Sequence, residues 1–384
     1  MMDVLLVAVV SLVGMSFCYL LLAIVGVMRF GRRLKARAPE SGEMPVTILK
    51  PLCGMETDIA ENLRSFCRQD YGAYQIVFGV RDRGDPVIRV VERIMEEFPA
   101  LDIALVVDDR VIGTNYKISN LSNMMAVARH DILAISDSDM RVRPDYLRTI
   151  AAPFADATVG ATTCLYSGTT RNGVASELGA MFVNDWFLPS ALVPTMVGEL
   201  RFCFGATMAV RRDVLAKFGG FAALANYLAD DYMLGHRVVQ QGYRIALAPY
   251  IVENVIYEAG IKGLFLHELR WARTIRSVQP VGYALSFITD VLPLSLIAAV
   301  PIYLATASSG WALAVPGVAL ALRLLLHFAV CRIAPPGTIC APWLIPLRDL
   351  LSVSVRVASF FGSRVQWRER SFVIRANNQL SAAE

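Results

Sequence analysis

The sequence DILAISDSD, residues 131–139, decides how the rest of the chain is interpreted. A short apolar run between charged residues is typical of a buried β-strand. Side chains two positions apart on an extended segment point the same way, so Asp137 and Asp139 should converge at the carboxyl end of that strand. Open α/β sheets bind their ligands there. Two carboxylates without a neighbouring His or Cys suit a hard divalent cation that also binds phosphate oxygens. The alternative is a solvated Asp-Ser-Asp turn.

Strand and helix patterns alternate on both sides of this stretch. Strands are predicted at residues 46–49, 75–80, 103–107 and 132–136, and helices at 61–69 and 118–128. A further helix should start at Asp85 and Pro86, with the aspartate as N-cap and the proline at the first helical position. Alternation of this kind predicts an α/β fold with a Rossmann-like, mostly parallel sheet. Residues 159–165 and 207–210 could add strands.

Both ends of the chain have the character of membrane segments. Residues 4–28 carry no charge and are long enough to cross a bilayer; no basic n-region precedes them, which predicts an uncleaved anchor. The basic residues that follow, Arg29, Arg32, Arg33, Lys35 and Arg37, place the downstream side in the cytoplasm by the positive-inside rule. A linker at 38–42 then leads into the soluble part.

The C-terminal region contains two further predicted spans, residues 291–307 and 311–330, joined by a turn at 308–310. Residues 343–361 are also apolar but include Arg348, Asp349 and Arg356. This segment is expected either to lie along the membrane interface as an amphipathic helix or to span with its charges paired. The resulting domains are an anchor at 1–30, a catalytic domain at 44–280, membrane or interfacial helices at 281–362, and a basic cytoplasmic tail at 363–384.

Composition limits the classes of function. The chain has 384 residues, enough for two domains or one domain with membrane segments, and 55% of them are hydrophobic. A net charge of +4 is too small to argue for a nucleic-acid partner. The seven cysteines are scattered without metal-ligand spacing, which indicates a reducing compartment rather than a disulfide framework. With four histidines in the chain, a His-based zinc site is not expected.

Three further residues, two of them at other strand ends, are candidates for nucleotide binding. Asp82 follows the second strand and could hydrogen-bond a base or ribose, although it could equally cap a turn. Lys50 lies at the corresponding end of the first strand and could meet the same nucleotide. Lys117 follows a Gly-containing loop at the start of a helix, where backbone N–H groups and a cation favour phosphate. A helix cap with a solvated lysine is the alternative at that position.

The sequence ADDYMLG contains the adjacent carboxylates Asp230 and Asp231. They could be helix N-caps, or one of them, Asp231, could be a general base that removes a proton from an acceptor hydroxyl.

The sequence HELRW, residues 267–271, precedes the membrane part. On a helix His267, Arg270 and Trp271 share a face. Arg270 could form two bonds with a diphosphate leaving group, and Trp271 could close over a sugar or acceptor. A basic helix that binds anionic lipid is the competing interpretation for the neighbouring Arg273 and Arg276.

The order of these elements resembles that of the membrane-bound inverting glycosyltransferases with a GT-A fold, whose signature is D, D, D, (Q/R)xxRW. The elements would be Asp82, Asp137 with Asp139, Asp231, and residues 267–271, with His267 standing where the signature has Gln or Arg. The chain is most similar to the ceramide glucosyltransferase family and its bacterial relatives of hopanoid biosynthesis. The similarity to the hopanoid branch is greatest in five stretches within residues 45–280: ILKPLCG, ENLRSFCRQDY, FGVRD, ADDYMLG and HELRWARTIRS.

The resemblance implies a UDP-sugar donor, Mg²⁺ or Mn²⁺, a lipid acceptor and a catalytic domain that faces the cytoplasm at a bacterial inner membrane. For the hopanoid branch it implies transfer of N-acetylglucosamine to bacteriohopanetetrol. In that mechanism Lys50 and Asp82 lie near the uridine, Asp139 with Asp137 holds the metal, and Asp231 is the base. Lys117 contacts the donor phosphates, and His267, Arg270 and Trp271 act on the leaving UDP and the acceptor.

Three other functions stay open at this point. One is a ceramide glucosyltransferase that uses UDP-glucose, and another is a processive polysaccharide synthase, which would need more helices. The third is a non-catalytic nucleotide-binding scaffold.

Overall fold

The computed structural model describes residues 2–35, 44–170, 173–338, 340–367, 370–374 and 379–382. Arg37 and the predicted linker at 38–42 lie outside these ranges. The chain forms two compact units, and neither is continuous in sequence. The sheet unit comprises Leu34–Ser167, Gly198–Tyr257 and Ser371–Glu384; the helical unit comprises Met1–Arg33, Gly168–Val197 and Glu258–Arg370.

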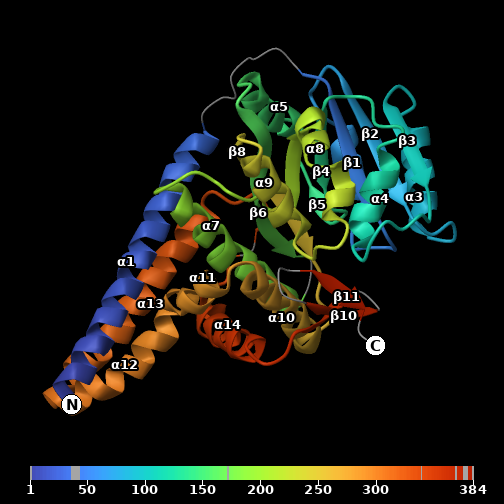
Figure 1. Ribbon diagram of the computed structural model, residues 1–384. Helices are drawn as coiled ribbons and strands as arrows, with labels where there is room; N and C mark the ends of the chain where they lie inside the picture. Colours follow the sequence, from blue (N-terminus) through green and yellow to red (C-terminus); the bar gives the residue numbers. More distant parts are fainter. Residues whose placement is uncertain are drawn as a thin grey trace. The chain divides into compact units, whose positions relative to one another are not determined.

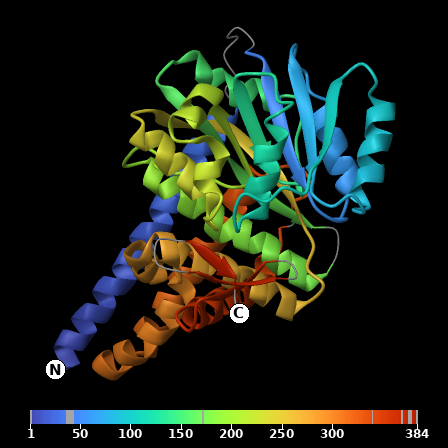
Figure 2. The ribbon, with the colours of Figure 1, turned by 45° about the vertical axis from the view of Figure 1, so that its right-hand side comes forward.

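The sheet unit is built on parallel strands in the order β3-β2-β1-β4 (Figures 1 and 2). The strands are β1 (Val46–Leu52), β2 (Tyr74–Val80), β3 (Asp102–Val107) and β4 (Ile132–Ser136). Between them run the helices α2 (Ile59–Cys67), α3 (Val87–Glu97) and α4 (Tyr116–Met124). The predicted α/β fold is therefore confirmed, including each of the strands expected in this half.

Beyond β4 the sheet continues with β7, β6, β8 and β5, and the register pairs β4 with β7, β7 with β6, and β5 with β8 in antiparallel fashion. These strands are β5 (Met140–Arg141), β6 (Val159–Thr170), β7 (Thr207–Arg211) and β8 (Arg244–Ile256). The helices among them are α5 (Tyr146–Ala151), η1 (Ala152–Ala155), α8 (Arg212–Lys217), η3 (Gly220–Leu224) and α9 (Asp230–Gln240). Near the C-terminus, β10 (Arg370–Ile374) and β11 (Leu380–Ala382) pair with each other.

Both faces of β1, β2 and β4 are buried, which explains why these strands are apolar without alternation. Ile48 on β1 faces one cluster, which contains residues of α2 and α3, and its neighbour Leu49 faces another, which contains residues of α4. Ala134 and Leu133 on β4 divide between the same two clusters. Polar side chains therefore meet this layered core at the ends of the strands.

The helical unit contains the segments with membrane character. Its elements are α1 (Met2–Leu34), α6 (Val174–Phe182), the π-helix η2 (Val183–Phe187), α7 (Leu188–Thr195), α10 (Ile261–Val278), α11 (Pro280–Leu285), η4 (Ser286–Thr289), α12 (Val291–Thr306), α13 (Ser309–Cys331), η5 (Pro342–Leu344), α14 (Ile345–Ser359) and β9 (Arg364–Trp367). Among the described residues, α1 and α13 are long and apolar enough to cross a membrane. Residues 280–306 make a third candidate if the two segments, bent by 66°, form one span.

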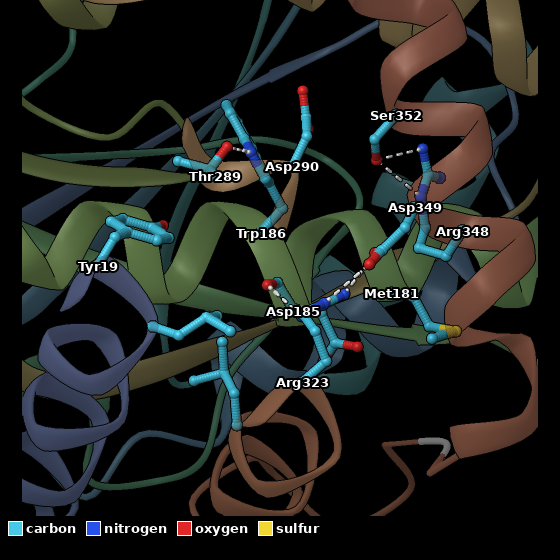
Figure 3. Close-up of a pocket in the computed structure, with 12 residues that line it drawn as sticks. Tyr19, Met181, Asp185, Trp186, Thr289, Asp290, Arg323, Arg348, Asp349 and Ser352 are labelled. Carbon is cyan, nitrogen blue, oxygen red and sulfur yellow. Dashed lines mark hydrogen bonds and ion pairs between the residues drawn. The ribbon is translucent and has the colours of Figure 1, made fainter. Parts of the chain in front are cut away.

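Helix α14 covers most of residues 343–361, for which lying along the interface and spanning the membrane both stay predictions. It has 15 residues, which at 1.5 Å per residue is roughly 22 Å and too short for a bilayer core of about 30 Å. Its charged residues are nevertheless buried and paired: Arg348 with Glu268, and Asp349 with Arg323 at 2.7 Å. Arg356 likewise lies 2.6 Å from the carboxylate of Asp290. Figure 3 shows how Arg323 and Asp349 point toward each other.

The start of α3 differs from the prediction by one residue. The helix begins at Val87, and Pro86 is its N-cap. The carboxylate of Asp85 still bonds the start of the helix and joins it to a second segment. One oxygen accepts the N–H of Val87 at 2.9 Å, and the other accepts the N–H of Gly54 at 2.7 Å.

Candidate active site

Asp137 and Asp139 occupy the turn between β4 and β5, directly after the strand that was predicted to carry them. The N–H of Met140 donates to the carbonyl oxygen of Asp137, which closes the turn. The carboxylate of Asp139 accepts a 2.8 Å hydrogen bond from the side-chain amide of Asn254 on β8. Ser138 between them is buried, so the segment is not the fully solvated turn of the alternative interpretation.

Lys50 lies beneath this turn and is fully buried. Its ammonium group donates to the carbonyl oxygen of Asp137 and sits 3.9 Å from the centroid of the Phe66 ring. Burial lowers the pKa of Lys50 to about 7, although the charges of Asp137 and Asp139 act in the opposite direction. Lys50 therefore fixes the backbone of the Asp-Ser-Asp turn from the inside of the sheet.

Lys117 reaches the same turn from the start of α4. Its Nζ lies 2.6 Å from a carboxylate oxygen of Asp137 and 3.5 Å from one of Asp230. Asn115 is the N-cap of the helix: its side-chain oxygen accepts the N–H of Ile118 at 3.2 Å. Burial by itself would lower the pKa of Lys117, but the charges of Asp137 and Asp230 outweigh it and the pKa is raised. Lys117 is thus held as a cation at a helix N-terminus, and its contact with phosphate stays a prediction.

Asp231 lies in the first turn of α9, where Ala229 rather than an aspartate is the N-cap. One carboxylate oxygen accepts the N–H of Tyr232 at 2.8 Å. The other oxygen lies against Gly205, and a Cβ added to Gly205 would come within 2.9 Å of it. Burial and the neighbouring charge of Asp230 raise the pKa of Asp231 to about 7. A carboxylate with this pKa is suited to accept a proton near neutral pH.

Negative charge exceeds positive charge in this cluster. Burial, and then the charges of Glu56 and Asp137, raise the pKa of Asp139 to about 7. The carboxylates that interact here are Asp137, Asp139, Glu56, Asp230 and Asp231, whereas the cations are Lys50 and Lys117. Oxygen donors with surplus negative charge fit a divalent cation, and Asp137 and Asp139 are the residues that could hold it. The same cation with Lys117 would favour a diphosphate.

Asp82 lies at the end of β2, in the turn that leads to α3. It is exposed, and its carboxylate accepts the N–H of Gly84 at 2.8 Å. This is the turn-capping arrangement that the sequence left open as an alternative. A contact with a base or ribose stays a prediction for Asp82.

The HELRW sequence lies on α10, in the helical unit. His267 and Trp271 share a face of the helix, with ring centroids 4.2 Å apart, and Nδ1 of His267 lies 2.7 Å from a carboxylate oxygen of Glu258. Trp271 stacks on Phe182 at 5.5 Å. Arg270 is half-buried on the same helix. That these side chains act together with the carboxylates of the sheet unit stays a prediction.

The sequence interpretation did not include Asn254, Glu56 or Gly205. Asn254 lies on β8, a strand that was not predicted, and it reaches Asp139 only because β8 pairs with β5. Gly205 carries no local signal, since its role is to leave room for Asp231. Each of these residues belongs to the site through a contact between segments far apart in the chain.

Known proteins give an independent comparison. A profile of the family described as "Glycosyl transferase family 21" matches residues 6–380. "Ceramide glucosyltransferase 3" of Caenorhabditis elegans is 24% identical over 298 residues, which are 77% of this chain and 64% of the relative. "Ceramide glucosyltransferase 1" of the same organism is 22% identical over 61% of this chain and 50% of its own length. The chain thus spans less than two thirds of the length of these curated relatives.

Among solved structures, the mannosyltransferase PcManGT from Pyrobaculum calidifontis, solved with GDP-Man and Mn²⁺, has a TM-score of 0.52 and 18% identity. The similarity covers 94% of this chain and 99% of that one. At this identity the comparison concerns the fold alone, and it supports the GT-A architecture. The family profile, by contrast, extends over the sheet unit and the helical unit alike, and the chain therefore belongs to glycosyl transferase family 21.

Proposed function

We propose that this protein transfers a sugar from a UDP-sugar to a hydroxyl group of a membrane lipid, with inversion at the anomeric carbon. The observation that carries the proposal is the cluster around Asp137, in which Lys117 holds a strand-end carboxylate and the pKa of Asp231 lies near 7. A structural role would not need buried carboxylates in such excess, because unpaired buried charge is destabilising.

The donor would bind at the ends of β1 and β4. Asp137 and Asp139 would hold Mg²⁺ or Mn²⁺, and this cation, when bound, would neutralise charge on the diphosphate. Lys117 would contact the same phosphates, and the position of its ammonium group beside Asp137 supports this role. Lys50 would keep the Asp-Ser-Asp turn in position, and Asp82 would bind the uridine from the end of β2.

Asp231 would act as the general base. It would take the proton from the acceptor hydroxyl as the oxygen attacks the anomeric carbon from the face opposite the departing UDP. A raised pKa helps here, because a carboxylate that titrates near neutral pH is a stronger base than an ordinary one. The amide N–H of Tyr232 and the space at Gly205 fix the direction of the carboxylate.

The helical unit would supply the remaining groups. Arg270 and His267 would stabilise the leaving UDP, and Trp271 would cover the sugar or acceptor. The membrane-type helices would keep the protein at its lipid substrate. We propose that the catalytic unit faces the cytoplasm, because basic residues directly follow the first predicted span. A bacterial inner membrane is what the resemblance to the hopanoid branch implies.

Two acceptors follow from different observations. The motifs resemble the hopanoid branch, which favours bacteriohopanetetrol and UDP-N-acetylglucosamine. The names of the curated relatives favour transfer of glucose to ceramide as a second candidate. Both acceptors are amphiphilic lipids with a polar hydroxyl group, so the site described above serves either.

The experiment is a crossed assay with the purified protein in lipid nanodiscs. Each UDP-sugar is supplied with each acceptor in Mn²⁺ or Mg²⁺, and products are analysed by mass spectrometry and by NMR of the anomeric proton. We expect one pair to give a β-linked monoglycosylated lipid, and Asp231→Asn to abolish it. Polymeric product would indicate the processive synthase instead. No transfer from any pair, with UDP-sugar binding intact, would favour the scaffold.

A further inference from the structure

The carboxyl end of α13 brings together an imidazole and two thiols in the helical unit. Nε2 of His327 lies 3.4 Å from Sγ of Cys340 and 3.8 Å from Sγ of Cys331. The three ligand atoms all lie within 4.8 Å of one another. A tetrahedral zinc site with Zn–N of about 2.05 Å and Zn–S of about 2.3 Å separates nitrogen and sulfur by about 3.6 Å. The observed spacings lie on either side of that value.

A hydrogen bond at Nδ1 of His327 leaves Nε2 of the ring to face the two thiols. Nδ1 lies 2.8 Å from a carboxylate oxygen of Asp185 on the π-helix η2, and both side chains are buried. Because a carboxylate only accepts, Nδ1 carries the hydrogen, and in the neutral ring Nε2 presents its lone pair toward Cys331 and Cys340. A carboxylate behind a metal-binding histidine is the usual arrangement that orients the ring and raises its basicity.

The chain reverses direction to complete the cluster. His327 and Cys331 are one helical turn apart on α13, and therefore lie on one face. Gly337 follows with φ of +94°, a left-handed conformation that glycine adopts without strain. The N–H of Thr338 donates to the carbonyl of Pro335 within this turn. The reversal returns Cys340 to the imidazole.

The cluster is accessible from water although His327 is not. Cys340 is exposed, and Cys331 is partly so. Gly31 of α1 packs against Ile333, since an added Cβ would come within 2.6 Å of its side chain. The thiols therefore lie at the same end of the helices as Arg32 and Arg33, where a membrane segment meets the aqueous phase.

We propose that His327, Cys331 and Cys340 bind one Zn²⁺, with Asp185 orienting the histidine and a water molecule or other small ligand in the fourth position. Two soft thiolates and an imidazole suit zinc better than Mg²⁺ or Mn²⁺, which prefer oxygen ligands. This site is separate from the carboxylate cluster of the sheet unit and is no part of the proposed sugar transfer. Its role is to fasten the end of α13 to the segment that precedes α14.

The sequence did not predict this site, because the cysteines show no metal-ligand spacing and a His-based zinc site was not expected. The signal present in the sequence is a His-x₃-Cys pair near the end of an apolar helix. The third residue follows only after a Pro-Pro-Gly turn, and spacing through such a turn cannot be read without coordinates.

The test measures metal in the full-length protein, purified in detergent through a tag without histidine and without chelator. We expect about one zinc per chain by elemental analysis in the wild type, and less than a tenth of that in Cys340→Ser. Cys340 is exposed and serine is of similar size, so this variant should fold. The matched control is Cys18→Ser, which changes an exposed cysteine on α1 and should keep its zinc. Asp139→Asn should also keep it.

A second measurement covers the case in which Cys340→Ser fails to fold. Wild-type protein stripped of zinc and loaded with Co²⁺ should develop a thiolate-to-cobalt charge-transfer band, which one equivalent of zinc removes. Asp185→Asn should weaken zinc binding about 10- to 100-fold. The proposal is overturned if the purified wild-type protein contains no zinc and also develops no charge-transfer band when Co²⁺ is added. A Cys331–Cys340 disulfide found by peptide mapping of native protein also overturns it, because oxidised sulfurs cannot serve as thiolate ligands.

Discussion

The two units treat buried charge in opposite ways. In the helical unit each of the buried arginines on α13 and α14 forms a bidentate ion pair with a carboxylate. The pairs are Arg323 with Asp349, Arg348 with Glu268, and Arg356 with Asp290. In the sheet unit Asp137, Asp230 and Asp231 share Lys117, Asp139 interacts with Lys50, and the pKa values of Asp139 and Asp231 are raised to about 7.

The difference separates stability from function. A paired charge in a low-dielectric interior is satisfied, and the small cavity of about 20 Å³ beside Asp185, Arg323 and Asp349 offers room for no more than about one water molecule (Figure 3). A cluster with surplus carboxylates is satisfied only when a cation, a proton or a cationic ligand joins it. We therefore assign a structural role to the paired charges of the helical unit and a catalytic role to the carboxylate cluster of the sheet unit. The predictions below test that division.

The largest effect should come from removing the proposed base. Asp231→Asn keeps the shape of the side chain but cannot accept a proton, so kcat should fall about 10²- to 10⁴-fold. The midpoint temperature of thermal unfolding should be unchanged or slightly higher, because the substitution removes the charge repulsion between Asp230 and Asp231. The control is Asp213→Asn, an exposed aspartate in the first turn of α8. Near-normal turnover by Asp231→Asn would make this assignment wrong.

The reverse pattern should appear in the helical unit. Asp349→Asn leaves Arg323 buried without its paired carboxylate and should lower the free energy of unfolding by about 3–5 kcal/mol. The double change Arg323→Met with Asp349→Leu should recover most of that loss, because it removes both charges. Denaturant titration in detergent measures both variants. A single variant as stable as wild type would show that the pair contributes no stability.

Activity should depend on pH through Asp231. Because burial and Asp230 raise its pKa to about 7, the carboxyl is protonated and inactive below that pH and deprotonated above it. We expect kcat/KM to rise up to tenfold per pH unit below 7 and to level off above it. Lys117 lowers this pKa, whereas Asp230 and Asp137 raise it, so Asp230→Asn should shift the midpoint to lower pH. A profile flat from pH 5 to 8 would contradict the assignment.

The smallest effect concerns position rather than charge. Gly205→Ala would place a Cβ 2.9 Å from the Asp231 carboxylate, closer than such atoms normally approach. The carboxylate must turn aside, and we expect kcat to fall about tenfold, by analogy with the sensitivity of reacting groups to small displacements. The comparison is Gly198→Ala, in open space in the same unit. Equal kinetics for the two variants would show that the direction of Asp231 does not matter.

Local patterns in the sequence predicted much of this molecule. The strand at Ile132–Ser136 was predicted to the residue, because four consecutive apolar residues end at a polar turn. The positions of Asp137, Asp231 and Lys117 also followed from local motifs. Their meeting through Lys117 could be expected only from the rule that parallel strands end at one edge of a sheet.

The remainder depended on partners distant in sequence. Arg348 looked costly in an apolar segment, and nothing near it indicated that Glu268 on α10 would pair with it. Asn254 could not be assigned to Asp139 without the antiparallel pairing of β5 with β8. The approach of Cys340 to His327 requires the reversal at Gly337. In each case the physical cause is a tertiary contact, for which the linear spacing of residues carries no signal.

The most direct test of the central claim is the affinity for UDP, measured by calorimetry with and without Mn²⁺ in wild type and in Asp139→Asn. If the surplus carboxylates form a metal and diphosphate site, Mn²⁺ should tighten UDP binding at least tenfold in wild type and have no effect in the variant. UDP binding that is the same in both proteins, with or without Mn²⁺, would contradict the account.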